Sequence, residues 1–395
     1  MKTFNVKLLY AYKFISQCLP MYAFYTLLFI KRGLSVSEVA ALIVLWSVFT
    51  IVFEVPSGIL ADRWNRRNML VLASVLQGLC FVVWFFSHAF WMFALGFVFW
   101  AIAGAFTSGT EEGLLFDNLK HDGCEDRFTA IYGKAQFFAN IGTASGLASA
   151  GVLANFIQIE TLALLSAAIC FFNAGFALQL REKNFYAEQL TPKIAGFVNT
   201  LKEAATFIRG SGVALLSVLF MVLFASIGSY LDEFDALIIN DFQINPVWVS
   251  VLLTVRFVLI ALGDVLAPMV QKKISSLRQI FAINAAACAL LAAFAVIWHP
   301  YAIPLFGLAC MAMTIAEVLL VNALQNEVKE AGRATVMSFC SVGQNIVMIC
   351  FSAAYALLAG IYTLQYVYII ISALSIAGSF AFYVLPGGKG IKRSM

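Results

Sequence analysis

The sequence alternates between long apolar runs and short polar breaks over almost its whole length. Each run has about 20 residues or more, which is the length that an α-helix needs to cross the hydrocarbon core of a bilayer. The runs lie at residues 8–30, 39–61, 68–86, 90–111, 129–155 and 159–180, and then at 212–239, 246–270, 277–298, 300–322, 334–360 and 363–385. The pattern therefore predicts an all-α membrane protein with twelve transmembrane helices in two groups of six.

A longer polar segment separates the two groups. We expect an N-terminal six-helix bundle over residues 1–185, a linker over 186–211 and a C-terminal six-helix bundle over 212–395. Residues 192–209 of the linker have amphipathic helical spacing, so they can lie on the membrane surface. The first 20 residues lack a small-residue cleavage site after their apolar stretch, which favours a retained first helix over a signal peptide.

Basic residues give the orientation, because Lys and Arg are retained on the cytoplasmic side of a membrane. With the N-terminus inside, twenty of the 25 basic residues fall in inside segments, and only Lys31 and Arg32 fall outside. The other three, Lys13, Lys134 and Arg256, lie within spans. This distribution predicts that both termini are cytoplasmic and that the number of helices is even.

The composition excludes a soluble globular protein. The chain has 395 residues, of which 62% are hydrophobic and 12% charged, whereas soluble domains carry roughly a quarter charged residues. The net charge of +4 is scattered, so we expect no nucleic-acid partner. The eight cysteines fit small core residues, and the three histidines fall in predicted loops. We therefore expect no metal site, no histidine relay and no cofactor.

The two groups of helices also show an internal repeat. The loops after the second and eighth spans, about 206 residues apart, carry matching basic clusters: Arg63, Arg66 and Arg67 in one, Lys272, Lys273 and Arg278 in the other. Two parallel six-helix halves joined by a cytoplasmic linker are typical of alternating-access transporters, whose site lies between the halves near the bilayer midplane.

The loop after the second span carries a recognisable motif, Gly58-Ile-Leu-Ala-Asp62-Arg63-Trp-Asn65-Arg66-Arg67. It resembles the signature G-x-L-A-D-R-x-G-R-R/K between helices 2 and 3 of the major facilitator superfamily. Asn65 replaces a glycine, and we expect it to adopt the left-handed backbone that the glycine would supply. The resemblance implies a conformational latch formed by Gly58, Asp62, Arg63, Arg66 and Arg67, with Glu112 and Asp117 as ionic partners. The alternative is a solvated basic turn.

Two further helices bear on the direction of transport. The fifth span places small residues in a spacing similar to an antiporter motif of the superfamily, at Gly133, Gly142, Gly146, Ala150 and Gly151, with Leu147 in place of a proline. These residues fit ordinary helix packing as well. In the fourth span, Trp100 stands where proton-coupled members carry an arginine. The segment from Ser108 to Asp117, together with Glu54, Pro56 and Gly58, is similar to a bacterial subgroup of drug or metabolite:proton antiporters.

Charged residues at membrane depth indicate function, because they are costly unless they face a cavity or a partner. Arg256 lies about ten residues into the eighth span, near the midplane. It either binds an anionic substrate group or pairs with a carboxylate, for which Asp232 and Asp235 are candidates. Lys13 lies near the cytoplasmic end of the first span, where we expect it to snorkel toward water.

Several acids could couple transport to protons. Glu54 is the first choice, because it lies two turns before Asp62 on roughly the same helix face; it could equally be a hydrogen-bonded structural acid. The alternatives are Asp232, Asp235, Asp264 and Glu317. Four polar residues at mid-depth suit either substrate binding or contacts between helices: Gln17, Asn140, Gln344 and Asn345.

These features predict a multi-pass transporter of the bacterial plasma membrane that works as a monomer among membrane lipids. The expected activity is export of a small amphipathic drug or metabolite in exchange for protons. Arg256 and Trp100 support an alternative, which is uptake of a small anionic or zwitterionic metabolite by symport or facilitated diffusion. The sequence has no GxxxxGK[ST] motif for ATP. An intramembrane enzyme lacks a candidate nucleophile and base, and a non-transporting receptor on the same fold stays open.

Overall fold

The computed structural model describes residues 4–63, 65–108, 110–124, 128–182, 206, 209–210, 212–225, 234, 237–238, 241–274, 276–327, 333–359 and 361–384. Every regular element within these ranges is a helix. Contacts divide the chain into two compact units, one formed by 1–192 with 244–254 and the other by 193–243 with 255–395. The predicted surface helix over 192–209 lies largely outside the described residues.

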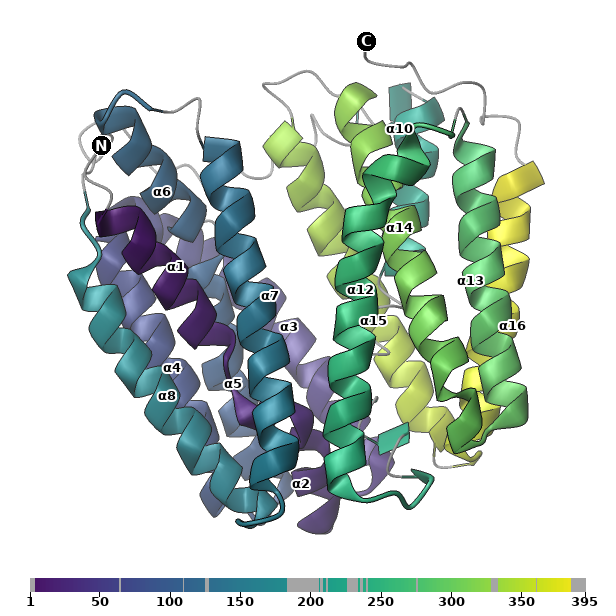
Figure 1. The fold of residues 1–395 in the computed structure, drawn as a ribbon, viewed down its shortest axis with the longest axis horizontal. Coiled ribbons are helices and arrows are strands. Elements are labelled where there is room, and N and C mark those ends of the chain that lie inside the picture. Colours follow the sequence, from purple (N-terminus) through teal and green to yellow (C-terminus); the bar gives the residue numbers. More distant parts are fainter. Residues whose placement is uncertain are drawn as a thin grey trace. The chain divides into compact units, whose positions relative to one another are not determined.

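Within its described residues the first unit is formed by helices α1 to α8 and one 3-10 turn (Figure 1). They are α1 (Phe4–Gln17), the 3-10 turn η1 (Pro20–Ala23), α2 (Tyr25–Lys31), α3 (Val36–Arg63), α4 (Arg66–Phe86), α5 (Phe90–Thr107), α6 (Thr110–His121), α7 (Phe128–Leu153) and α8 (Ile159–Gln179). The first predicted span is thus interrupted at η1, where Pro20 cannot donate a backbone hydrogen bond. The fourth is interrupted between α5 and α6.

The second unit contains α10 (Gly212–Phe220), the π-helical turn η3 (Met221–Ala225), α12 (Pro246–Gln271), α13 (Leu277–Ile297), the 3-10 turn η4 (Pro300–Ala302), α14 (Ile303–Glu327), α15 (Arg333–Ala359) and α16 (Leu364–Val384). The first residues of α12, up to Thr254, group with the first unit. Over the part of the chain that is described, nine helical segments are long and apolar enough to cross a membrane. The protein is therefore an all-helical, multi-pass membrane protein, as predicted.

Aromatic side chains fill the core of the first unit. The helix α4 packs against α5 and α8, and α3 packs against α5. Trp84 is fully buried between them, stacks on Tyr25 with ring centroids 5.6 Å apart, and donates from Nε1 to the Phe93 carbonyl at 3.1 Å. Gly96 leaves room for this ring, because a Cβ at this position would overlap the indole. The hydrogen bond satisfies the one polar atom of Trp84 inside the apolar core.

The glycines of α7 allow close packing against α1 and η1. A Cβ at Gly142 would meet the Phe14 carbonyl oxygen, and one at Gly146 would lie 2.7 Å from the Leu19 nitrogen. Both glycines belong to the small-residue face predicted for the fifth span. In the structure that face brings two helix backbones together, which is the packing role of small residues in membrane helices.

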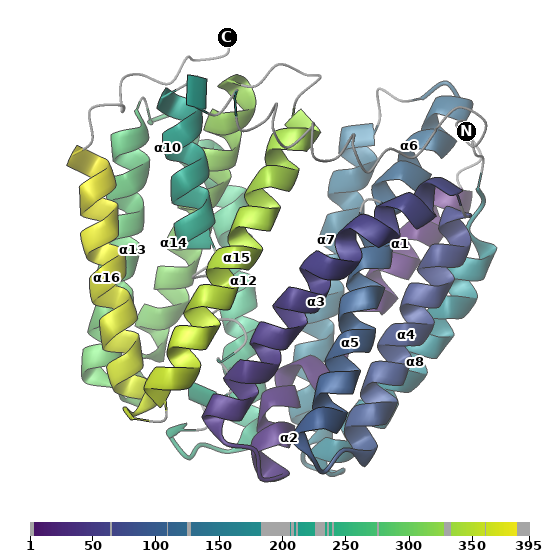
Figure 2. The same cartoon turned by 180° about the vertical axis from the view of Figure 1, so that it is seen from behind.

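The core of the second unit is built on α13, which packs against α14 and α16 (Figure 2). Phe220 of α10 stacks on Phe281 of α13 with ring centroids 4.6 Å apart. Asn284 of α13 donates from Nδ2 to Ser379 Oγ of α16 at 3.0 Å, so this buried amide ties two helices together. A hydrogen bond between buried polar side chains offsets the cost of removing both from water.

Candidate functional site

The break between α5 and α6 positions a carboxylate inside the first unit. Ser108 follows the last residue of α5 with φ and ψ of −58° and 127°, outside the helical region, and Glu111 is the second residue of α6. A carboxylate is favoured there because the first turn of a helix carries a partial positive charge. The Glu111 Oε2 atom lies 2.5 Å from Lys13 Nζ on α1, and the two residues are only 9% and 8% exposed.

The prediction that Lys13 snorkels to water is therefore wrong. Its ammonium turns inward because a carboxylate from a distant segment, 98 residues further along the chain, lies within hydrogen-bond reach. A buried ion pair is tolerated where geometry and hydrogen bonds offset the loss of hydration of both charges.

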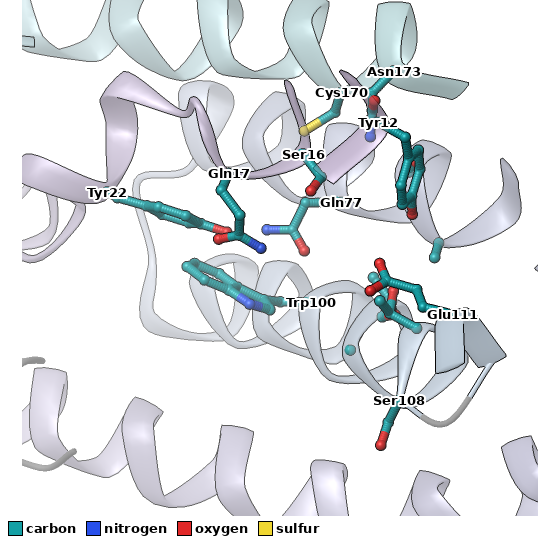
Figure 3. Close-up of a pocket in the computed structure, with 15 residues that line it drawn as sticks. Tyr12, Ser16, Gln17, Tyr22, Gln77, Trp100, Ser108, Glu111, Cys170 and Asn173 are labelled. Carbon is teal, nitrogen blue, oxygen red and sulfur yellow. The ribbon is translucent and has the colours of Figure 1, made fainter. Parts of the chain in front are cut away.

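Glu111 lines a cavity of about 310 Å³ that lies entirely within the first unit (Figure 3). The walls come from α1, η1, α4, α5, α6 and α8. The labelled polar and aromatic lining residues are Tyr12, Ser16, Gln17, Tyr22, Gln77, Trp100, Ser108, Glu111, Cys170 and Asn173. In Figure 3 the carboxamides of Gln17 and Gln77 lie above the Trp100 indole, and the Glu111 carboxylate lies toward Tyr12.

Among the described residues that line this cavity, two have a buried side-chain atom with no hydrogen-bond partner. These atoms are Nε2 of Gln77 on α4 and Oδ1 of Asn173 on α8, and Asn173 is 1% exposed. Nearby, Tyr12 hydrogen-bonds Ser74, whose own hydroxyl donates to the Leu70 carbonyl at 3.0 Å. An unpartnered buried polar atom carries the full cost of lost hydration, so native proteins rarely keep one without a use.

Aromatic rings form the other end of the cavity. Trp100 stacks on Tyr22 with ring centroids 5.3 Å apart and an interplanar angle of 21°. Trp100 also contacts the aromatic core through Trp84 and Phe97. The position where the resemblance expected an arginine thus belongs to an aromatic cluster.

Arg256, a second buried cation, lies in the second unit and is 4% exposed. Its Nε atom is 3.3 Å from Cys310 Sγ on α14. Its guanidinium carbon lies 5.4 Å from the centre of the Phe306 ring and 5.7 Å from that of Phe257, which are cation–π distances. Asp232 and Asp235, the predicted carboxylate partners, lie outside the described residues.

The predicted latch region contains an unexpected helix cap. The Glu182 carboxylate, just beyond α8, accepts from the backbone N–H groups of Arg66 and Arg67 at 2.7 and 3.0 Å. Asn65 does not adopt the predicted left-handed backbone, because its φ and ψ of −68° and 119° are extended. A turn into α4 in this conformation needs no glycine at residue 65, which explains why Asn65 can replace it.

The remaining latch residues are only partly described. A Cβ at Gly113 would lie 2.7 Å from the Arg66 guanidinium, so this arginine packs against α6. The structure does not describe the side-chain placement of Gly58, Asp62, Arg63, Glu112 and Asp117. Their latch role stays a prediction.

The other predicted site residues are dispersed. Gln17 lines the cavity. Asn140 is exposed on α7, Gln344 and Asn345 are half-buried on α15, Asp264 is exposed on α12 and Glu317 is exposed on α14. The structure does not describe the side chain of Glu54. Among the described residues, no group of three His, Cys, Asp or Glu side chains could hold a metal ion.

The sequence reasoning missed Glu111, Gln77 and Asn173 as site residues. A lysine inside an apolar span was the available signal for Glu111, since such a charge requires a carboxylate at the same depth. Asn173 had a similar signal, because it is a polar residue in the middle of the apolar run Ile-Cys-Phe-Phe-Asn-Ala-Gly-Phe. Neither signal says which helices meet.

Comparisons with known proteins agree with this architecture. The family model described as Major Facilitator Superfamily matches residues 14–332. An uncharacterized MFS-type transporter, YfkF of Bacillus subtilis (strain 168), is 34% identical over 64 residues, which are 16% of this chain and 15% of that protein's length. Because the match spans so little of this relative, it carries no information on substrate.

Solved structures are similar over almost the whole chain. The nucleoside transporter NupG has a TM-score of 0.79 at 16% identity, covering 97% of this chain and 98% of its own. The POT family transporter PepTSo has a TM-score of 0.73 at 12% identity, covering 97% of both chains. A D-xylose-proton symporter scores 0.73 at 12% identity, covering 96% of this chain and 95% of its own. At these identities the likeness concerns the fold.

Proposed function

Since the chain belongs to the Major Facilitator Superfamily, a family of membrane transporters, we propose that it is a proton-coupled secondary active transporter in which Glu111 carries the coupling proton. The observation that carries this proposal is the buried Lys13–Glu111 pair on the wall of a polar cavity. A carboxylate that is shielded from bulk water but borders a cavity can bind and release a proton as water access changes.

The net charge of this pair explains how it could couple the flux of protons to the flux of a solute. With Glu111 ionised, the pair with Lys13 is neutral; with Glu111 protonated, the site carries one positive charge. That charge is costly in a dry cavity and much less costly when water fills it. A solute that displaces the cavity water therefore disfavours proton binding. Competition between solute and proton for one site is what an exchange mechanism requires.

Other groups around Glu111 fit this role. Tyr12, Tyr22 and Cys170 are the other titratable side chains among the described residues that line the cavity, and Arg66 packs against α6 at Gly113. Tyr12 interacts electrostatically with Glu111, and its hydroxyl hydrogen-bonds Ser74. Glu54 remains a second candidate for the coupling acid.

The proposal includes the direction and the setting of transport. Competition of this kind with an inward proton gradient favours export of a small solute. We further propose twelve transmembrane helices with both termini in the cytoplasm of a bacterial cell, a location in the plasma membrane and function as a monomer. Latching by Arg63, Arg66 and Arg67 belongs to the same proposal.

One observation favours the alternative of uptake of an anionic or zwitterionic metabolite. Arg256 of α12 is buried beside Cys310 and Phe306 of α14, at membrane depth, where a fixed cation can bind an anionic group. If Arg256 binds the substrate, Arg256→Gln should abolish flux of carboxylate-bearing solutes. Flux of neutral solutes would not change.

The test is transport by purified protein in liposomes with an imposed pH gradient, with lumenal pH and solute flux recorded together. Sidedness is fixed by protease access to the central linker. Glu111→Gln should abolish gradient-driven flux, because a glutamine cannot bind or release a proton. Exchange of solute against solute should persist with a weakened solute affinity, because the uncompensated Lys13 charge mimics the proton-loaded site.

Glu160→Gln is the matched control. Glu160 also pairs with a lysine, Lys31, at 2.8 Å, but the Lys31 side chain is 53% exposed. This variant should retain gradient-driven flux. Full gradient-driven flux in Glu111→Gln would refute the assignment and return Glu54, Asp264 and Glu317 to consideration.

A further inference from the structure

Resting on the transport function proposed above, we infer that the cavity of the first unit binds a small uncharged solute rich in hydrogen-bonding groups. The solute would be held between the carboxamides of Asn173 and Gln77. Three features carry this inference: the unpartnered polar atoms, the neutral charge of the lining, and the size and aromatic end of the cavity.

The unpartnered atoms define what a ligand must offer. Oδ1 of Asn173 accepts hydrogen bonds, and Nε2 of Gln77 donates them. They come from α8 and α4, helices that pack directly against each other. A ligand with both a hydroxyl or amide donor and an oxygen acceptor would satisfy the two groups at once. Gln17, Ser16 and Tyr12 line the same cavity and add further polar contacts.

The charge of the lining argues against an ionic solute. Glu111 is the one Asp, Glu, Lys or Arg among the described lining residues, and Lys13 already neutralises it. A charged solute would lose its hydration on entering the cavity, and the one carboxylate in the described lining is already paired with Lys13. The loss of hydration would therefore not be offset. An uncharged solute avoids this loss of charge hydration and leaves the Lys13–Glu111 ion pair intact.

Size narrows the class further. A volume of about 310 Å³ is at the lower end of ligand pockets, which span roughly 300–1,000 Å³. This favours a compact metabolite over a large drug. The Trp100 and Tyr22 rings at one end favour a solute with an apolar or planar face, since aromatic rings bind such faces while polar groups fix orientation. Uncharged sugars and nucleosides have this chemistry.

The effect of replacing Asn173 on stability distinguishes a binding role of this residue from a structural one. A buried amide oxygen without a partner destabilises the empty protein, so replacing Asn173 by Leu should maintain or raise the thermal unfolding temperature. The same replacement should weaken solute binding. A purely structural amide, in contrast, would lower the unfolding temperature when removed.

The experiment is calorimetric titration of purified protein with uridine and D-xylose as uncharged probes, and with uridine 5′-monophosphate and tetraphenylphosphonium as charged ones. We expect saturable binding of at least one uncharged probe, and no comparable binding of the charged probes. Asn173→Leu and Gln77→Leu should each weaken that binding about tenfold or more, equivalent to about 1.4 kcal/mol.

Gln179→Leu is the matched control on the same helix. Gln179 is exposed and donates to the Gly175 carbonyl at 3.1 Å, away from the cavity lining. It should leave binding unchanged. If Asn173→Leu lowers the unfolding temperature, Asn173 has a structural role, and the affinity of Gln77→Leu alone tests the solute site. Preferred binding of a charged probe, unchanged affinity in both cavity variants, or no saturable binding of either uncharged probe would overturn the inference.

The two proposals fail separately. One result is Asn173-dependent binding of an uncharged probe, with gradient-driven flux that is unchanged in Glu111→Gln. This result would support the solute site and refute the coupling role of Glu111. Glu111-dependent flux of a charged solute, with no binding of uncharged probes, would retain the coupling role and reject the solute class.

Discussion

Lys13 and Arg256 are both cations buried inside apolar helices, but their surroundings differ. Lys13 pairs with a carboxylate on the wall of a cavity, whereas the contacts of Arg256 include a thiol and two phenylalanine rings. A lysine ammonium is a compact, strongly hydrated charge, and a guanidinium is planar and weakly hydrated. The comparison shows two ways of surrounding a buried cation: a carboxylate beside the compact ammonium of Lys13, and sulfur and aromatic rings around the planar guanidinium of Arg256.

The largest expected effect comes from breaking the Lys13–Glu111 pair on one side. Glu111→Leu leaves a buried ammonium without its counter-ion. We expect the folding free energy to fall by about 3–5 kcal/mol, the usual cost of stranding a buried charge. Thermal unfolding of the purified protein in detergent measures it.

The double variant Lys13→Met/Glu111→Leu is the control for this prediction. Replacing both members by apolar residues of similar size removes the stranded charge, so most of the lost stability should return. Equal destabilisation in the single and double variants would mean that packing at α6, and not the charge, determines the result.

A second prediction concerns the packing that holds Lys13 in position. Gly142→Ala places a methyl group against the Phe14 carbonyl oxygen, next to Lys13 on α1. We expect a loss of about 1–3 kcal/mol from this overpacking. Gly175→Ala on α8 is the matched control, because no atom lies within 4 Å of its added Cβ. It should be neutral or stabilising, and differential scanning fluorimetry would compare the two.

A third prediction tests the surroundings of Arg256. Arg256→Lys and Phe306→Leu, made singly and together, form a double-mutant cycle across a guanidinium–ring distance of 5.4 Å. We expect a coupling of about 0.5–2 kcal/mol in unfolding free energy, because lysine keeps the charge but loses the planar stacking. If the losses of unfolding free energy in the two single variants add up in the double variant, the Phe306 ring does not stabilise the guanidinium. A cation–π interaction would then not distinguish Arg256 from Lys13.

The sequence predicted the helices far better than the site. Apolar runs long enough to cross a membrane mark their own positions, so α4, α8, α13 and α16 begin and end within two residues of the predicted runs. The interruptions at Pro20 and Ser108 were missed, since both lie inside continuous apolar pattern. The Lys13–Glu111 pair was missed for a different reason. It depends on which helices pack together, and periodicity along one chain does not contain that information.

The smallest expected effect concerns a second carboxylate, Glu182, which lies at the edge of the first unit instead of inside it. It accepts from the N–H groups of Arg66 and Arg67 at the start of α4, where it is half-buried. Glu182→Gln removes the charge but keeps one acceptor, so we expect a loss of only about 0.5–1 kcal/mol. Added salt should shrink this loss and leave the cost of Glu111→Leu nearly unchanged, because screening acts on exposed charges more than on buried ones. Unfolding temperatures of both variants at low and high ionic strength measure this contrast, and equal salt dependence would show that burial does not distinguish the two carboxylates.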